Sequence, residues 1–305
     1  MLKYKVEHRM INMSKMHANE FNVDLNLVKG LINEQFPEYS MLAISPLNSV
    51  GNVNNIYRLG DEFYIRLPRV MDWIDIDKEL KWIPHLASHL TLKIPEPIAM
   101  GQPNASYPAK WAIYRWINGS EYSDELIHDE GEAAKDLSNF VNELRAIEVP
   151  IDAPKAGRSP LLDLNKKTIE AIEAAKDVLD VDRVISAWED SCQASVWSGH
   201  AVWIHADLLR TNLLVNSGRL TAVIDFGSVG VGDPAFDLIP AWSIFSSSGR
   251  KIFQYHINEN KDTWLRARGY ALHQALLIIP YYRETFPKFV NHAKKTINEI
   301  LQDIE

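Results

Sequence analysis

The sequence has 305 residues, of which 46% are hydrophobic and 24% are charged, and its formal net charge is −8. This composition is typical of a soluble globular protein, and the length allows two ordinary domains or one large two-lobed fold. The negative charge argues against a nucleic-acid partner, because phosphate backbones are bound by clustered Lys and Arg. A cationic small substrate is compatible with it.

The cysteine count and the apolar pattern exclude two further classes of protein. Cys192 is the only cysteine, which excludes an intrachain disulfide and a zinc site built from several thiolates. No stretch approaches the roughly 20 apolar residues of a membrane span, and the N-terminal stretch has no apolar core of signal-peptide length. We therefore expect a cytoplasmic protein with no membrane partner. The oligomeric state is not predicted.

The N-terminal third of the chain begins with a helical pattern and continues with strand and turn signals. Apolar spacing predicts a short amphipathic helix over residues 21–36, with Asp24 as its N-cap. Residues 48–52 are small and polar. Residues 56–59 and 63–67 then alternate with turns, which predicts an antiparallel β-meander.

Beyond the meander the pattern is mostly helical. A helix over residues 75–90, interrupted by Pro84, precedes a strand over residues 111–114. The remaining helical segments, in which breaks are expected at Pro280 and Pro287, are residues 133–148, 161–197, 239–245, 264–282 and 289–304.

Residues 202–238, VWIHADLLRTNLLVNSGRLTAVIDFGSVGVGDPAFDL, place three oxygen-bearing side chains at short, fixed distances along the chain. Two apolar runs around the turn-rich segment 216–219 predict an antiparallel hairpin, which would put Asn212 opposite Asp225. Amide and carboxylate oxygens are hard ligands suited to Mg²⁺. Asp207, on the loop that enters the hairpin, could face the same metal and accept a proton from an incoming hydroxyl. This arrangement favours phosphoryl transfer.

The pattern H-x-D-x-x-x-x-N followed by D-F-G has the spacing of the catalytic and metal-binding loops of kinases. The wider string IHADLLRTNLLV…AVIDFGSVGVGDPAFDL resembles the aminoglycoside phosphotransferase family of kinase-like enzymes. The resemblance implies that Asp207 is the catalytic base, that Asn212 and Asp225 bind Mg²⁺, and that His205 braces the loop. One departure is Ala206, where the family usually has glycine. Alanine prefers a negative φ, so this departure bears on the backbone angle at residue 206 and not on the expected chemistry.

The resemblance also implies a nucleotide-binding part that uses ATP. The residues it assigns are Ser49, Gly51 and Asn52 in a turn over the phosphates, Arg66 on the phosphates with Glu79 as its partner, and the backbone of Arg115, Trp116 and Ile117 at the adenine. From the residues alone, the turn can be an ordinary hairpin and Glu79 one more solvated carboxylate.

The fold implied by the resemblance is α+β and protein-kinase-like, with two lobes. Residues 1–115 would form a small N-terminal lobe of antiparallel β-sheet that binds the nucleotide. Residues 116–305 would form a larger helical C-terminal lobe that carries the catalytic residues and binds the substrate.

The function that follows is Mg²⁺-dependent transfer of the γ-phosphoryl group of ATP to a hydroxyl of a small molecule. Only residues 227–234 separate the metal aspartate from the GDPxxDL segment, which is too short for a peptide platform. The net charge favours a cationic, aminoglycoside-type antibiotic as acceptor. An acidic run supports this preference, although it can also be a solvated face; it contains Glu121, Asp124, Glu125, Asp129, Glu130 and Glu132.

Alternatives of the same and of other classes stay open. A kinase of a choline-like, sugar or amino-alcohol metabolite, or of a macrolide, would carry the same motifs. A nucleotide-binding pseudokinase would explain the sparse glycines of the predicted phosphate turn. A metal-dependent hydrolase would use His205, Asp207 and Asp225 and leave Arg66 and Glu79 without a role.

Overall fold

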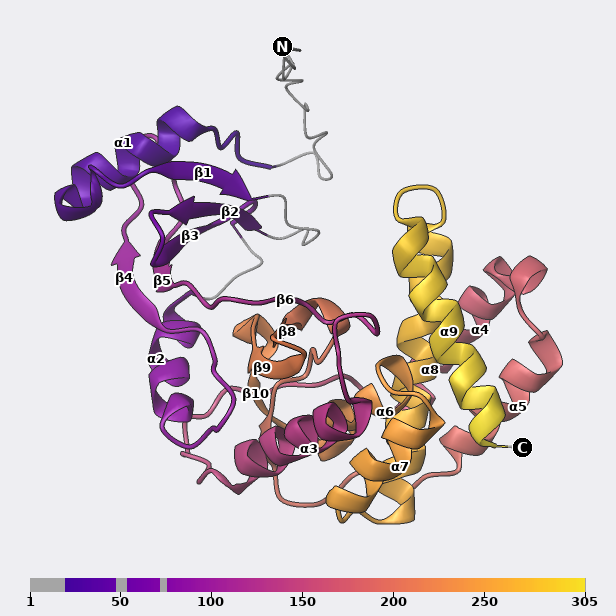
Figure 1. The fold of residues 1–305 in the computed structure, drawn as a ribbon. Helices are drawn as coiled ribbons and strands as arrows, with labels where there is room; N and C mark the ends of the chain where they lie inside the picture. Colours follow the sequence, from indigo (N-terminus) through magenta and orange to yellow (C-terminus); the bar gives the residue numbers. More distant parts are fainter. Residues whose placement is uncertain (1–19, 48–53, 72–75, 305) are drawn as a thin grey trace, which may run out of the picture. The chain divides into compact units, whose positions relative to one another are not determined.

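A helix packed on an antiparallel sheet forms the N-terminal unit of this computed structural model, which describes residues 20–47, 54–71 and 76–304 (Figure 1). Asp24 caps α1 by accepting a hydrogen bond from the backbone N–H of Leu27 at 2.8 Å, as predicted. The helix α1 is Leu25–Gln35, and the sheet, in spatial order, consists of β1 (Ile44–Leu47), β2 (Asn54–Leu59), β3 (Phe63–Pro68), β5 (Trp111–Arg115) and β4 (Pro97–Gly101).

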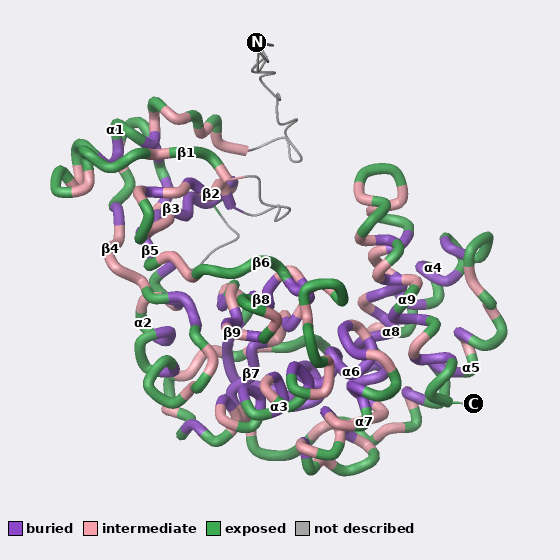
Figure 2. Tube along the Cα trace, in the orientation of Figure 1, coloured by how far each residue is buried: buried purple, intermediate pink, exposed green. Residues whose placement is uncertain are grey.

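All neighbouring strands of this sheet are antiparallel, so the predicted β-meander is confirmed. Its core forms where Val28, Leu31 and Ile32 of α1 pack against Leu67 and Trp111 of the sheet, all of which are at most 1% exposed. Figure 2 marks the buried positions of α1, β2 and β3 in purple. The apolar face of this short helix is thus buried against the sheet, and this contact stabilises the unit.

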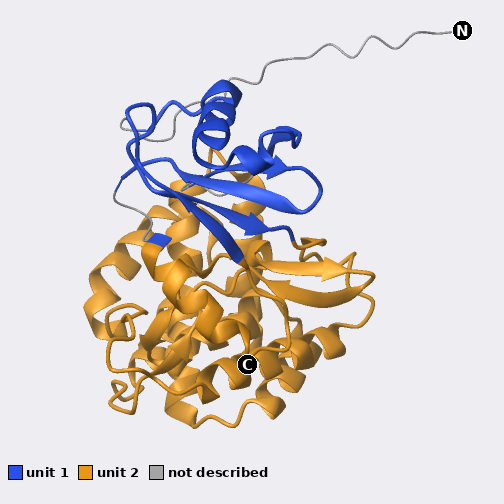
Figure 3. Cartoon of the chain, turned by 90° about the vertical axis from the view of Figure 1, so that its left-hand side faces the viewer, with its two compact units in different colours: residues 1–76, 97–116 blue, residues 77–96, 117–305 orange. Residues whose placement is uncertain are grey.

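Contacts divide the chain into two units, coloured separately in Figure 3: residues 1–76 with 97–116, and residues 77–96 with 117–305. The second unit is mainly helical, and none of the helices in the described ranges is long and apolar enough to cross a membrane. Its helices are α2 (Ile76–Ala87), α3 (Glu130–Ala146), α4 (Leu161–Ala174), α5 (Val181–Cys192), α6 (Pro240–Ser243), α7 (Ser247–His256), α8 (Lys261–Tyr282) and α9 (Pro287–Asp303).

Short strands of the second unit hold the loops between these helices. β6 (Ser120–Glu121) pairs with β8 (Leu213–Asn216), β8 pairs with β9 (Arg219–Val223), and β7 (Val202–Ile204) pairs with β10 (Gly230–Gly232), each pair antiparallel. An antiparallel sheet followed by a mostly helical part is the predicted α+β class, which is thereby confirmed.

Two sequence expectations about helices were wrong. Pro84 and Pro280 do not interrupt α2 and α8, because each lies in or near the last turn, where a missing backbone N–H costs few further hydrogen bonds. The helix α7 was missed because its sequence contains few apolar residues. One of its buried side chains is Arg250, which is held by Glu299 at 3.0 Å and Asp303 at 3.1 Å.

Two glycines of the N-terminal unit should respond to alanine in opposite directions. A Cβ at Gly101 would lie 1.9 Å from the buried ring of Trp111, so Gly101→Ala should destabilise the protein by roughly 1–3 kcal/mol or more. A Cβ at Gly30, on the exposed face of α1, would meet nothing within 4 Å. Gly30→Ala should therefore stabilise by roughly 0.5–1 kcal/mol. Urea unfolding followed by tryptophan fluorescence measures both changes, and equal effects would contradict this packing.

Candidate active site

The hairpin β8–β9 lies between Asn212 and Asp225, the two residues predicted to bind a metal. Its turn is formed by Ser217 and Gly218, which both have positive φ (51° and 79°), as tight hairpin turns require. The predicted hairpin is therefore confirmed, but its predicted register is wrong by one residue. The backbone N–H of Ile224 donates to the carbonyl of Asn212 at 2.8 Å, so Asn212 lies opposite Ile224; the two-residue turn and one extra residue in β9 set this register.

The side chains of Asp207 and Asn212 lie together in the loop before this hairpin. Asn212 Nδ2 donates to the backbone carbonyl of Asp207 at 2.8 Å and to its carboxylate Oδ2 at 3.0 Å. Burial raises the pKa of the Asp207 carboxyl to about 6, and the nearby carboxylate of Asp225 acts in the same direction. The hydrogen bond from Asn212 and the positive charge of Arg158 oppose that shift of the pKa. Asp207 is thus a partly buried carboxylate with an amide, a carboxylate and a guanidinium as neighbours.

His205 is fully buried and uses both ring nitrogens inside the protein. Its Nε2 bonds to the carbonyl of Ile224 at 3.1 Å, and its Nδ1 accepts from the backbone N–H of Asp207 at 3.3 Å. Its ring also packs edge to face with the ring of Phe226, with the two ring centres 4.7 Å apart. Burial lowers the pKa of His205 to about 4, so the ring is neutral at neutral pH. The imidazole is a brace between the catalytic loop and the strand end, and neither nitrogen is left to ligate a metal.

Asp237 is a functional residue that the sequence analysis did not assign. It is fully buried, and its two carboxylate oxygens accept from the backbone N–H groups of His205 at 2.7 Å and Ala206 at 2.8 Å. Burial raises the pKa of Asp237 to about 6. The two backbone donors and the positive charge of Arg145 act in the opposite direction and lower this pKa. The only sequence signal for Asp237 was its place in the GDPxxDL string. That string does not indicate a contact with Ala206, which lies 31 residues earlier in the chain.

Ala206 adopts the left-handed backbone angle that its position requires, with a φ of 65°. This confirms the concern raised by alanine in place of the family's glycine, since a Cβ is strained at such a φ. The bond to Asp237 holds the peptide in this conformation. The chain therefore tolerates a strained residue directly before Asp207.

Relief of this strain is measurable. Ala206→Gly should stabilise the protein by roughly 0.5–1 kcal/mol, because glycine reaches positive φ without a steric cost. Ala206→Val should destabilise it by more than about 1 kcal/mol, because a β-branched residue is worse at this angle. Thermal and urea unfolding of the two variants test the claim, which fails if glycine is no more stable than alanine.

The donor set around Asp207 fits a magnesium ion. The Nδ2 of Asn212 is committed to Asp207, which leaves its Oδ1 as an oxygen ligand. Asp225 follows β9 with a left-handed φ of 63°, and its negative charge is close enough to raise the pKa of Asp207 in addition to burial. Two adjacent carboxylates and an amide oxygen form a set that a divalent cation stabilises.

The residues predicted for the nucleotide phosphates fall into two groups. Ser49, Gly51 and Asn52 lie outside the described residues. Arg66 is 7% exposed in β3, where Asn54 accepts from its Nε and Nη2 at 2.7 and 3.0 Å when the amide oxygen faces the guanidinium. Glu79, in the first turn of α2, is only 1% exposed, so it is not a solvated carboxylate. The pairing of Arg66 with Glu79 stays a prediction.

The predicted adenine-binding segment begins at the end of β5. Arg115 is the last residue of that strand and is exposed, and the backbone N–H of Trp116 donates to the carbonyl of Glu62 at 2.7 Å. The guanidinium of Arg58 lies 3.9 Å from the centre of the Trp116 ring. Ile117 is the first residue of this segment in the second unit. Adenine binding by this backbone stays a prediction.

Most of the acidic run is engaged within the protein. Asp124 pairs with Arg210 at 2.6 Å and Lys295 at 2.8 Å, and Asp129 caps α3. Glu130 accepts from the backbone N–H of Ser246 at 2.8 Å. Glu132 lies 3.5 Å from Arg219, whereas Glu121 and Glu125 are exposed. The run is therefore largely structural, and its charge is partly neutralised.

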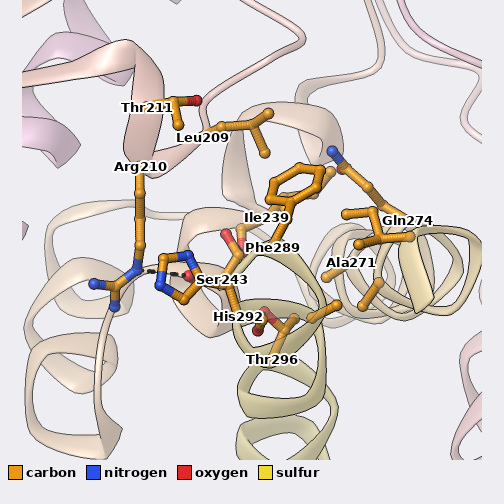
Figure 4. A pocket seen from close by; sticks show the side chains of 13 residues that line it. Leu209, Arg210, Thr211, Ile239, Ser243, Ala271, Gln274, Phe289, His292 and Thr296 are labelled. Carbon is orange, nitrogen blue, oxygen red and sulfur yellow. Dashed lines mark hydrogen bonds between the residues drawn. The ribbon is translucent and has the colours of Figure 1, made fainter. Parts of the chain in front are cut away.

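A small hollow of about 50 Å³ lies beside the catalytic loop, where Leu209 and Thr211 face α8 and α9 (Figure 4). Its wall is mainly apolar and includes Phe289 and the neutral amide of Gln274. Arg210 turns toward the carbonyl of Ser243, 3.2 Å from its Nε, and pairs with Asp124. No Asp or Glu side chain contributes to this wall among the residues the structure describes.

Comparison with known proteins assigns a family to this arrangement. A family model for the phosphotransferase enzyme family matches residues 45–270. "Uncharacterized protein YcbJ" of Bacillus subtilis (strain 168) is 22% identical over 228 residues, which cover 68% of this chain and 71% of that protein.

Solved structures share the fold over nearly the whole chain. The GDP and kanamycin complex of an APH(2″)-IIIa enzyme has a TM-score of 0.67 at 18% identity and covers 90% of this chain and 98% of that one. The macrolide 2′-phosphotransferase MphH from Brachybacterium faecium has a TM-score of 0.56 at 18% identity, with the same coverage. The kinase-like α+β fold is thereby established, since identities this low concern the fold alone.

Proposed function

We propose, from the premise that this chain belongs to the phosphotransferase enzyme family and is a small-molecule kinase, that it moves the γ-phosphoryl group of ATP to a hydroxyl of its acceptor. The observation that carries the proposal is the contact of Asp207 with Asn212 beside the carboxylate of Asp225. Positioning and charge neutralisation supply most of the catalysis in such a transfer.

Each of the three residues has a distinct role. Asp207 accepts the proton of the attacking hydroxyl, and its bond from Asn212 fixes the carboxylate for that purpose. Asn212 Oδ1 and the Asp225 carboxylate would hold Mg²⁺, which when bound neutralises charge on the transferring phosphate. The fully buried His205 keeps the loop backbone in place, which favours phosphotransfer over a hydrolase that would use this histidine as a ligand.

The nucleotide is assigned to the N-terminal lobe, residues 1–115, and the acceptor to residues 116–305. Ser49, Gly51, Asn52 and Arg66 would contact the phosphates, Glu79 would orient Arg66, and the backbone of Arg115, Trp116 and Ile117 would hold the adenine. The buried position of Arg66 in β3 and the burial of Glu79 support this assignment. Structures of the same fold in complex with GDP support a nucleotide in general.

The acceptor proposed first is an aminoglycoside-type antibiotic, supported by the net charge of −8 and by the kanamycin complex of a structure with the same fold. A second candidate, a kinase of a small metabolite, is favoured by a specific observation. Four of the six residues of the acidic run are held by groups of the protein itself, which weakens the local attraction for a polycation.

The test uses labelled transfer from ATP to a panel of aminoglycosides, macrolides, amino alcohols, sugars and hydroxy acids. Asp207→Ala should lower kcat by about 10²–10⁴-fold, while the Kd for ATP changes little, because the base acts on the acceptor. Asp182→Ala, an exposed carboxylate in the first turn of α5, is the matched control and should leave kcat unchanged.

Two outcomes would decide against this function. Full turnover by the Asp207→Ala variant would remove Asp207 as the base. Nucleotide binding by the wild type without transfer to any acceptor, water included, would identify a pseudokinase instead.

A further inference from the structure

A cavity of about 350 Å³ in the second unit is lined by none of the residues assigned to the proposed reaction. Ligand sites commonly fall between roughly 300 and 1,000 Å³, so this volume suits a small organic molecule. The cavity is formed by the segment that leads into α4, the end of α5, β10 and one face of α8. The side chains that matter for the argument are Lys155, Arg158, Leu161, Trp197, Phe236 and Tyr270.

Val231 and Gly232 of β10 line one side of this cavity, and the glycines of this strand let another segment approach it closely. A Cβ at Gly230 would lie 2.5 Å from the carbonyl of Pro154, and one at Gly232 would lie 2.4 Å from the carbonyl of Ala156. Because glycine has no Cβ, residues 154–156 can lie against β10, where Lys155 forms an isolated parallel bridge with Val231. Gly157 then turns the chain with a φ of 100°, and Arg158 follows directly. The backbone is thus arranged to bring Lys155 and Arg158 to the cavity.

Lys155 and Arg158 are exposed cations, and the carboxylate whose charge acts on Arg158 is that of Asp207, which lies outside the cavity wall. Neither the ammonium of Lys155 nor the guanidinium of Arg158 makes a hydrogen bond or ion pair with any residue in the described ranges. Arg266, in the same wall, is different because Asp233 accepts from its Nε at 2.7 Å and its Nη2 at 3.1 Å. Asp233 therefore offsets Arg266, and the wall keeps two net positive charges in a chain of net charge −8.

The start of α4 adds a further feature that attracts anions. Pro160 occupies the N-cap, and no side chain caps this 14-residue helix. Leu161 and Leu162 of its first turn belong to the cavity wall. Free backbone N–H groups and the positive end of the helix dipole favour a negative group at such a position.

The rest of the wall is apolar and aromatic. Phe236 and Tyr270 stack with their ring centres 4.2 Å apart, and Trp197 and Val196 complete this side. Phe236 and Tyr270 are already at most 3% exposed, so the apolar surface left for a ligand to cover is that of Val196, which is 57% exposed, and of the partly exposed Trp197. The cavity therefore combines a cationic end with an apolar side.

We propose that this cavity binds a small organic anion, whose carboxylate or phosphate group is held by Arg158 and Lys155 at the start of α4 while its apolar or aromatic body covers Trp197 and Val196. The proposal does not depend on phosphotransfer. Because Arg158 is also a charged neighbour of Asp207, the ligand lies beside the proposed reaction centre. An acceptor that carries an anionic group would be held in this place.

The experiment measures the binding of benzoate and phenyl phosphate by calorimetry, with benzamide as an uncharged probe of similar shape. Both anions should bind, and benzamide should bind at least about tenfold more weakly, because it lacks the charge-assisted hydrogen bonds. Arg158→Gln should raise the Kd of both anions about tenfold or more. Its melting temperature should change little, since the side chain is exposed and makes no hydrogen bond or ion pair in the described protein.

Two control variants separate this cavity from other cationic sites. Lys166→Gln removes one charge from the exposed side of α4, where the side chain is 88% exposed, and should leave the Kd unchanged. Arg66→Gln changes the proposed nucleotide site and should also leave it unchanged. The proposal is overturned if neither anion binds, if benzamide binds as tightly as benzoate, or if Arg66→Gln rather than Arg158→Gln weakens binding. None of these readouts requires nucleotide or turnover, so they stand whether or not the proposed function holds.

Discussion

The carboxylate of Asp237 is the constraint on which the loop around the proposed base depends. It accepts from two consecutive backbone N–H groups, those of His205 and Ala206, in a fully buried position. Buried N–H donors without an acceptor are costly, so this carboxylate determines the conformation that the loop can adopt. The left-handed angle of Ala206 follows from this arrangement. Asp207 then leaves the turn with its side chain at the amide of Asn212.

The same short segment connects the loop to the helical part of the unit. Asp233, four residues before Asp237, caps the turn by accepting from Ala235 at 3.0 Å and holds Arg266 of α8. Arg145 of α3 donates to the carbonyl of Pro234 at 2.7 Å. Two aspartates in five residues thus link strand, loop and helix around the proposed base.

The sequence predicted what local chemistry determines and missed what distant contacts determine. The β8–β9 hairpin was predictable because Ser217 and Gly218 lie in a segment whose composition specifies a tight turn. Its register near Asn212 was not, because the bulge after Leu214 has no local signal. The role of Asp237 was missed since its partners lie 31 and 32 residues away. The spacing of Asp207, Asn212 and Asp225 identified the candidate site, whereas the charge of its surroundings required the structure.

Charge shows this limit most clearly. The net charge of −8 describes the whole chain, yet the cavity wall next to Arg158 is positive and much of the acidic run is paired. A ligand experiences the local field of its pocket more than the total charge, because salt screens distant exposed charges over about 8–10 Å. The acceptor is therefore better judged from these walls than from composition.

The central claim is that Asp207, Asn212 and Asp225 form one metal-dependent phosphoryl-transfer centre. It is tested most directly by measuring labelled phosphoryl transfer as a function of Mg²⁺ concentration in the wild type and in Asp225→Asn. The account predicts that the variant needs at least about tenfold more Mg²⁺ for half-maximal transfer, because a charged oxygen ligand is lost. An unchanged Mg²⁺ dependence with full activity in Asp225→Asn would contradict it.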